Sequence, residues 1–352
     1  MIPRVRLFLV LTRPAVAFLF CVYVVIGLAK AGDTGTGLRL FQDLLVVIGF
    51  LVFSVAVNDL SDAPIDRQNL PNSNRPLVTG RADEREMKIV ALTAAAVSIG
   101  VAALGGWLLL ALAVGGLVLS TAYSLPPARL ASRGAVAALV LPAGYVAVPF
   151  LVGLLSVRTS VTRDDGLLLV GLYVGFIGRI LLKDFRDVRG DALFGKRTFL
   201  VRRGRRATCA VSAMFWTAGG TLVVATTPHP TAAYVATTSA GLFGVLVLLR
   251  MLANERSARR DEAIISGIAI IGRTVLVLLV AQLSMTDKHW PPLGANVMLA
   301  CFAAVSAGAV RSMLVHGPRS NLVTPAQTAR AQPAPVEGPR SFAAGNAGRR
   351  AG

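Results

Sequence analysis

Long apolar runs, separated by short polar segments, are the dominant pattern along the chain. Ten of them have about the 17 to 23 residues that a helix needs to cross a bilayer. They lie at residues 14–31, 41–61, 86–105, 107–124, 134–155, 166–187, 207–226, 231–250, 263–284 and 294–314. The runs are continuously apolar, whereas the strands of a membrane β-barrel alternate between apolar and polar positions. The pattern therefore predicts an all-α fold, a polytopic bundle of nine or ten transmembrane helices.

Glycine and proline refine this picture at two places. The third run is joined to the fourth by the very short turn Gly105-Gly106-Trp107, so these two helices are expected to form an antiparallel hairpin. Pro142 and Pro149 lie inside the fifth run. Because proline lacks the amide donor that a helix uses, we expect this helix to be kinked.

The composition agrees with a membrane protein. Of the 352 residues, 54% are hydrophobic and only 15% are charged, which is far more apolar than a soluble domain. Near residue 317 the chain becomes rich in Pro, Ala, Gly, Arg and Ser, with almost no large apolar residues. We therefore expect a transmembrane domain at residues 1–316 and a disordered, basic cytoplasmic tail at residues 317–352.

The net charge of +18 is explained by topology. The basic residues lie between the predicted helices and not on one soluble face, which argues against a nucleic-acid partner. With the amino terminus in the cytoplasm, most of the 36 Lys and Arg fall on the cytoplasmic side, as is usual for membrane proteins. The opposite loops hold Lys30, Arg39, Arg158, Arg163 and Lys288. The basic residues 1–13 precede a long apolar run without an evident cleavage site, so we expect this run to be the first transmembrane span and not a signal peptide. The protein is expected to be a multi-pass protein of a bacterial-type plasma membrane.

Two matched acidic clusters stand at the ends of apolar runs, at residues 44–57 and 167–182, and both face the cytoplasm in this topology. Both have the spacing D-x-x-D-x-x-x-D. The first consists of Asn58, Asp59, Asp62 and Asp66, and the second of Asp184, Asp187 and Asp191. Acidic residues at the edge of hydrocarbon cost a few kcal/mol unless something compensates them. A shared polycation, most simply a pair of Mg²⁺ ions, would do so.

Proline limits the regularity of the first cluster. An ideal helix would place Asp59, Asp62 and Asp66 within about 60° of one another on one face. Pro64 lies between the last two acids and is expected to break or kink the helix. We therefore predict a helix end that carries the first two acids as direct metal ligands and an unwound turn that presents the third.

Basic residues near both clusters are candidates for binding phosphate, because Arg and Lys bind the phosphate oxygens that a metal leaves free. The candidates are Arg67, Arg75, Arg179, Lys183, Lys196 and Arg197. Arg179 and Lys183 are four residues apart and should share a helix face, where they bind a substrate anion or pair with the nearby acids. The cluster Arg202 to Arg206 is expected to serve topology and anionic lipid, and Arg273 is a lone membrane cation with Asp261 or Glu262 as its expected partner.

These motifs, in this order, resemble the UbiA superfamily of membrane prenyltransferases, of the 4-hydroxybenzoate polyprenyltransferase-like type. The resemblance covers roughly residues 14–310. It rests on the N-D-x-x-D-x-x-x-D that begins at Asn58, on Asn74-Arg75-Pro76-Leu77 with Gly80, on Tyr123-Ser124 before two prolines, and on the K-D-x-x-D-x-x-G-D of residues 183–191 followed by Gly195-Lys196-Arg197-Thr198.

The resemblance implies a helical bundle around a central cavity that opens to lipid. A polyprenyl diphosphate would lie there, held through Mg²⁺ by the two acidic motifs, and its allylic cation would be attacked by an acceptor, commonly an aromatic ring of the quinone-precursor type. The implied metal ligands are Asn58, Asp59, Asp62, Asp66, Asp184, Asp187 and Asp191. Asp62, Asp187, Lys183 and Tyr123 would be catalytic, and Asn74, Arg75, Lys196 and Arg197 would bind the diphosphate.

Three alternatives remain at this point. The second motif also resembles that of members that alkylate glycerol lipids, and one branch of the superfamily transfers phosphoribose to a polyprenyl phosphate. A membrane transporter is the non-enzymatic alternative, but the acids cluster at one membrane face and no Gly- or Pro-broken helices pair near the midplane. The family usually has nine spans, so one of the last predicted helices is additional to that pattern or is not a span.

Overall fold

Nine of the ten predicted apolar runs are essentially helical in the computed structural model, and the run at 166–187 is helical as far as Ile180. The structure describes residues 2–33, 37–69, 75–185, 198–255, 257–287 and 291–317. The elements in chain order are α1 (Ile2–Leu11), α2 (Pro14–Lys30), α3 (Leu38–Asn69), α4 (Glu84–Leu104), α5 (Trp107–Ser124), η1 (Leu130–Ser132), α6 (Ala135–Pro142), η2 (Ala143–Ala147), α7 (Val148–Leu155), α8 (Arg163–Ile180), α10 (Phe199–Thr226), α11 (Ala232–Asn254), α12 (Ala258–Asp287) and α13 (Pro292–His316). The described residues form no strand, so the all-α prediction is confirmed.

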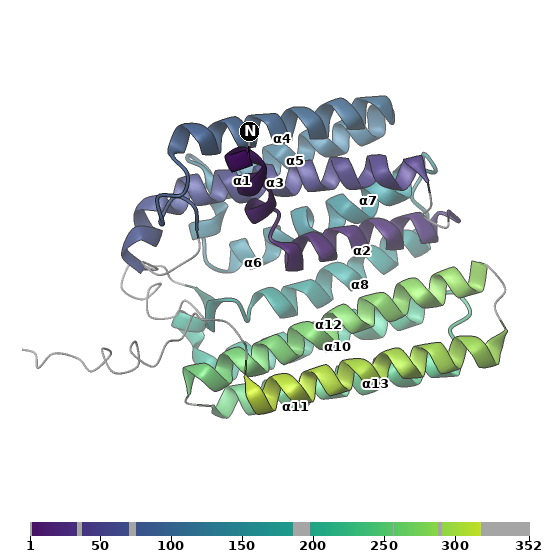
Figure 1. Cartoon of the computed structure of the whole chain (residues 1–352). Coiled ribbons are helices and arrows are strands. Elements are labelled where there is room, and N and C mark those ends of the chain that lie inside the picture. The colour runs from purple at the N-terminus through teal and green to yellow at the C-terminus, as the bar shows by residue number, and fades with distance from the viewer. Residues whose placement is uncertain are drawn as a thin grey trace, which may run out of the picture. The chain divides into compact units, whose positions relative to one another are not determined.

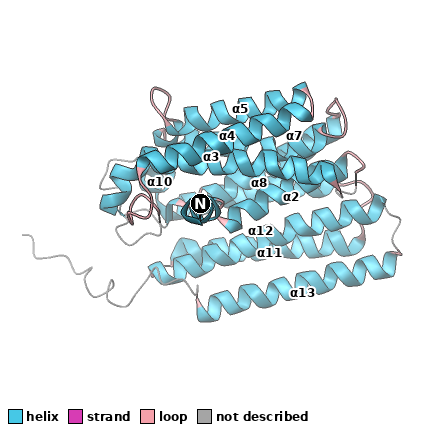
Figure 2. Cartoon of the chain, turned by 45° about the horizontal axis from the view of Figure 1, so that its top comes forward, coloured by secondary structure: helices cyan, strands magenta, loops and turns pink. Residues whose placement is uncertain are grey.

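Eight helical segments within the described residues are long and apolar enough to cross a membrane, with α6, η2 and α7 counted as one, and α2 is apolar but shorter. The helices run side by side (Figures 1 and 2). The main pairs are α3 with α4, α8 with α10, α2 with α7, and α12 with both α11 and α13. The predicted hairpin is present, because α4 ends at Leu104, α5 begins at Trp107 and the two helices pack together. Residues 318–352, where the tail is expected, lie outside the described part.

Close backbone contact fixes α2 against α7. A Cβ atom on Gly27 would lie 2.2 Å from the carbonyl oxygen of Phe150, and one on Gly153 would lie 2.1 Å from that of Val24. Both distances are far below van der Waals contact, so only glycine permits this approach. The contact places the helix that includes η2 firmly against the start of the bundle.

The fifth apolar segment is irregular, as its prolines predict. It consists of α6, the π-helical turn η2 at Ala143–Ala147, and α7. Pro142 ends α6 and Pro149 stands in the first turn of α7. A π turn inside an α-helix shifts the side chains that follow it around the helix axis and is frequent at functional sites.

The helix α3 does not unwind at Pro64, which corrects the prediction of a broken first motif. It continues as one helix from Leu38 to Asn69 with Pro64 inside it. One physical reason is an ionic clamp across the proline: Arg75 pairs with Asp66 beyond it and lies 3.7 Å from Asp59 before it. This clamp offsets the backbone hydrogen bond that proline removes.

Candidate active site

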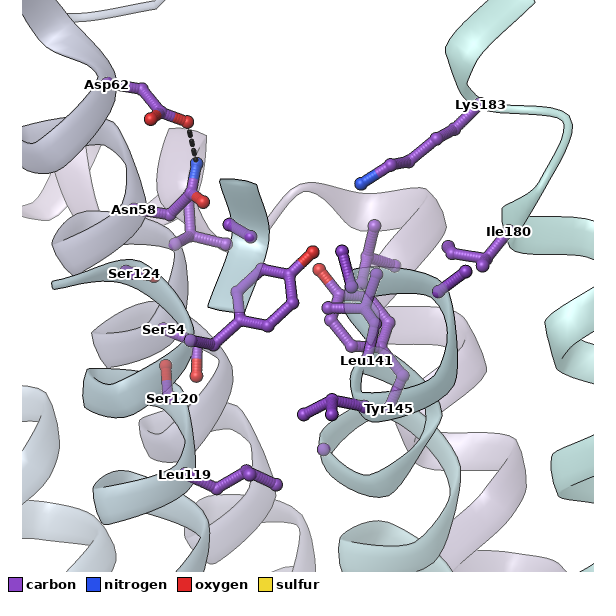
Figure 3. Close-up of a pocket in the computed structure, with 18 of the residues that line it drawn as sticks. Ser54, Asn58, Asp62, Leu119, Ser120, Ser124, Leu141, Tyr145, Ile180 and Lys183 are labelled. Atoms are coloured by element: carbon purple, nitrogen blue, oxygen red, sulfur yellow. Dashed lines mark hydrogen bonds between the residues drawn. The ribbon is translucent and has the colours of Figure 1, made fainter. Parts of the chain in front are cut away.

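A cavity of about 450 Å³ lies where α3, α5, α6, η2 and the end of α8 meet (Figure 3). Its polar part is lined by Arg13, Asn58, Asp62, Arg75, Tyr123, Lys183 and Asp184. Its apolar part is lined by Phe50, Val55, Leu119, Val140, Leu141 and Tyr145. The cavity therefore has a charged end and a hydrocarbon end, the two environments that an amphiphilic ligand needs.

One stripe of α3 runs along the cavity. Phe50, Ser54, Asn58 and Asp62 all line it and are spaced four residues apart. Residues four apart share a helix face, so the apolar and polar ends are joined by a single helix side. The amide nitrogen of Asn58 donates to the carboxylate of Asp62 over 3.2 Å (Figure 3), which orients both side chains toward the cavity.

The other two acids of the first motif are engaged differently. Asp59 and Asp66 are buried and are not part of the cavity lining. The guanidinium of Arg13, in the turn between α1 and α2, donates to the Asp59 carboxylate over 2.8 Å. Arg75 pairs with Asp66. The sequence grouped three acids, and the structure brings only Asp62 of them to the cavity.

The helix that precedes the second motif ends earlier than expected, because α8 ends at Ile180 rather than near residue 187. Lys183 and Asp184 therefore lie past the helix end, and both line the cavity. Arg179 lines a smaller pocket with Tyr23 and Trp216 instead. The prediction that Arg179 and Lys183 share a helix face is wrong, since the helix stops between them.

Lys183 reaches into the cavity from the side opposite Asn58 (Figure 3). Burial alone would lower the pKa of its ammonium, but the neighbouring Tyr123 and Asp184 raise that pKa above the ordinary lysine value. The side chain is therefore a fixed positive charge at neutral pH. Tyr123 lines the same cavity.

Two cavity residues, Arg13 and Tyr145, and the nearby Arg129, which is not in the cavity lining, escaped the sequence interpretation. Arg13 lies far from both motifs in sequence, and Arg129, which stands 3.7 Å from Asp62, follows the two prolines after Tyr123. Tyr145 comes from the π turn, where its ring packs edge-on against Phe20 at 5.3 Å. An aromatic residue between two helix-interior prolines was the available signal for Tyr145, and the positions of the two arginines carried none.

Several sequence-predicted site residues lie outside the described part of the chain. They are Asn74, Asp187, Asp191, Lys196 and Arg197. Arg67 is within α3, but its side chain is not described. Their roles stay predictions.

The cavity donors suit a hard cation. Asn58 and Asp62 of α3 and Asp184, which follows the end of α8, offer oxygen atoms to the cavity, and oxygen is the ligand type that Mg²⁺ prefers. Within the described residues no three His, Cys, Asp or Glu side chains form a metal-binding group. The two remaining acids of the second motif fall outside those residues, and the oxygen donors that are present fit Mg²⁺.

Arg205 has a different role from the lipid contact expected for the basic cluster at residues 202–206. Its guanidinium makes two hydrogen bonds to Asp261, of 2.9 and 2.6 Å, and one of 2.8 Å to the carbonyl of Leu252. Asp261 is thus the partner of Arg205, which overturns its expected pairing with Arg273. No described residue forms an ion pair with Arg273, whose Nε is buried without a partner.

Comparison with known proteins identifies the family to which the chain is similar. A family model described as "UbiA prenyltransferase family" matches residues 18–271. Digeranylgeranylglyceryl phosphate synthase from Methanopyrus kandleri is 30% identical over 217 residues, 60% of this chain and 74% of the relative. Chlorophyll synthase from Oryza sativa subsp. japonica is 32% identical over 161 residues, 43% of this chain and 42% of the relative. The chain therefore spans less than half the length of that synthase.

Solved structures share the fold at low sequence identity. A digeranylgeranylglyceryl phosphate synthase has a TM-score of 0.60 and 17% identity, with 80% of this chain and 98% of that chain covered. A UbiA homolog from Archaeoglobus fulgidus bound to DMAPP and Mg²⁺ has a TM-score of 0.54 and 16% identity, with 88% and 99% covered. The family match ends within α12, so α13 lies beyond it.

Proposed function

Because the chain belongs to the UbiA prenyltransferase family, we propose that it transfers the prenyl group of a polyprenyl diphosphate to an aromatic acceptor, with Mg²⁺ as cofactor. The observation that carries the proposal is the two-ended cavity. The charged end suits a diphosphate, and the apolar end, with Phe50 and Leu141, suits an isoprenoid chain. The pocket lined by Arg179 has no carboxylate, and a third pocket, lined by residues such as Ile99 and Pro127, has no charged side chain.

The cations would act on the leaving group. As the bond between the prenyl carbon and the diphosphate oxygen breaks, the electron pair leaves with the diphosphate and its negative charge grows. Arg13, Arg75 and Lys183 line the cavity, and fixed positive charges of this kind stabilise such a transition state more than the bound substrate. Lys183 stands across the cavity from Asn58, so the diphosphate would be held from two sides.

Asn58, Asp62 and Asp184 would hold Mg²⁺, joined by Asp187 and Asp191 as the motif predicts. When bound, Mg²⁺ neutralises charge on the diphosphate oxygens. The allylic cation formed by the bond cleavage would lie between the charged end and the rings of Tyr123 and Tyr145. The acceptor then supplies an electron pair to the prenyl carbon and loses a proton, which balances the transfer.

A glycerol lipid is the second candidate acceptor. It is favoured by the alignment with digeranylgeranylglyceryl phosphate synthase, which covers 217 residues and is longer than the 161-residue alignment with chlorophyll synthase. We also propose that the charged end of the cavity faces the cytoplasm of a bacterial-type cell, because the basic loops cluster at that side of the predicted topology.

The test is a donor and acceptor panel with purified protein in lipid nanodiscs. Radiolabelled polyprenyl diphosphate is expected to be consumed with Mg²⁺ and one acceptor class, either a hydroxylated aromatic acid or a glycerol phosphate lipid. Phosphoribosyl diphosphate with polyprenyl phosphate is the third arm. Turnover only in that arm would contradict the proposal, and so would intact donor in every arm.

A further inference from the structure

The carboxylate of Asp59 points in a different direction from the side chains of its motif neighbours Asn58 and Asp62. Asn58 and Asp62 line the cavity, whereas Asp59 is buried behind it, with only 3% of its side chain exposed. Successive residues of a helix are about 100° apart around its axis. The step from Asn58 to Asp59 therefore moves the carboxylate off the cavity stripe and into the protein.

Two arginines meet at this buried carboxylate. One oxygen of Asp59, Oδ1, lies 2.8 Å from the Arg13 guanidinium and 3.7 Å from that of Arg75. The arginine side chains are 38% and 27% exposed, and both line the cavity. The acid is thus the inner partner, and the cations are the groups that a ligand would meet.

The buried Asp59 carboxylate reduces the repulsion between the two arginine side chains. Two guanidinium groups that face one cavity repel each other, and long arginine side chains lose conformational freedom when held in place. A buried carboxylate beneath both groups offsets the repulsion and fixes their directions, as supporting shells do around binding sites. Arg13 also has a left-handed backbone, with φ 45°, a strained conformation for a residue other than glycine that surrounding contacts must hold.

We infer that Asp59 is a positioning residue for Arg13 and Arg75, which bind the diphosphate, and that it is not a metal ligand. The inference rests on the proposed function and divides the first motif by role. Asn58 and Asp62 would serve the metal, and Asp59 would serve the cations. Arg13, contributed by the turn before α2, becomes a substrate-binding residue.

Isosteric variants separate these roles. Asp59→Asn and Asp62→Asn each remove one charge from the same helix without changing side-chain size. Two affinities are measured on full-length protein in nanodiscs: inorganic diphosphate by calorimetry with Mg²⁺, and Mn²⁺ by electron paramagnetic resonance at saturating diphosphate. Loss of one charge-assisted contact corresponds to about a tenfold change in affinity.

For Asp59→Asn we expect diphosphate affinity to fall about tenfold while the Mn²⁺ concentration for half occupancy stays within about twofold of the wild type. For Asp62→Asn that Mn²⁺ concentration should rise about tenfold or more. An equal rise in both variants would show that Asp59 is a ligand and overturn the inference, with the proposed function intact. Wild-type protein that consumes no donor would instead remove the function itself.

Arg13→Gln is a second test of the same contact, in case the Asp59→Asn variant folds poorly. It should weaken diphosphate binding to a similar degree, and the double variant should lose less than the product of the two single losses, because both changes break one contact. Full multiplication of the losses would contradict a shared role. Thermal unfolding of each variant shows whether the bundle is intact.

Discussion

The guanidinium of Arg205 lies 4.9 Å from the centre of the Phe185 ring. Phe185 is buried and directly follows Asp184, which lines the cavity. Through the same guanidinium, Asp261 of α12 and the end of α11 are tied to the start of α10. The second acidic motif is therefore anchored to three helices by one side chain.

Replacement of Arg205 by Ala should destabilise this corner of the bundle. Asp261, which is buried, would lose both of its hydrogen bonds from Arg205, and the unfolding free energy should fall by about 2 kcal/mol. Denaturant titration in mixed micelles measures this. Arg206→Ala is the control, because Arg206 is exposed and its removal should change stability by less than about 0.5 kcal/mol.

Tyr145→Leu should slow the chemical step. If the ring stabilises the allylic cation with about 2 kcal/mol, as aromatic rings do for desolvated cations, kcat should fall about 30-fold. The donor KM should change little, since the interaction belongs to the transition state. Tyr145→Phe keeps the ring and should retain most activity. Equal losses in both variants would show that the hydroxyl, and not the ring, is what matters.

Phe50 is expected to limit the length of the prenyl chain. Its ring lies at the apolar end of the cavity, 3.4 Å from the positions that a Cβ on Gly116 or Gly144 would take. Phe50→Ala should raise kcat/KM for a donor of four isoprene units, relative to one of two units, by about tenfold.

The control for Phe50 is Phe53→Ala, on the next turn of α3 and outside the cavity lining. It should leave the ratio of the two donors unchanged. An unchanged ratio in Phe50→Ala as well would mean that the chain leaves the cavity along another path.

Gly153→Ala should destabilise the packing of α2 against α7. The added Cβ would lie 2.1 Å from the carbonyl oxygen of Val24, and an overpacked site of this kind costs about 1 to 3 kcal/mol. A fall in the thermal unfolding midpoint is the readout. Gly100→Ala, where no atom lies within 4 Å of the new Cβ, should be neutral or slightly stabilising because alanine favours helix.

Most of the fold was predictable because membrane helices are specified by continuous apolar length. That signal is strong over 17 or more residues, and each of the ten runs contains helix, although the run at 166–187 is helical only as far as Ile180. Helix ends are harder to predict. The apolar run of α8 continues past Ile180, and nothing in its composition marks the point at which the chain turns to present Lys183.

Pro64 shows how tertiary contacts override local preference. Proline opposes helix, and the sequence alone gives no measure of what opposes the proline. Arg75, which pairs with Asp66 and approaches Asp59, comes from a later loop. The sequence pattern of α3 alone therefore gives no indication of this ionic contact.

The candidate site was predictable where residues share a helix and less so where they meet across the bundle. Asn58 and Asp62 follow from their spacing. Arg13 and Tyr145 reach the same cavity from distant segments, and the different burial of Asp59 and Asp62 depends on which face of α3 neighbouring helices cover. Spacing grouped these two acids, and packing separates them.

The most direct test of the central claim is the release of diphosphate from a polyprenyl diphosphate by purified protein with Mg²⁺ and acceptor. The wild type and Glu84→Gln, which alters an exposed acid outside the cavity, should release diphosphate at similar rates, and a metal chelator should stop both. Asp62→Asn should reduce the rate about 100-fold or more, as expected when a group that stabilises transition-state charge is lost. Undiminished release by Asp62→Asn, or release that persists in the chelator, would contradict the account.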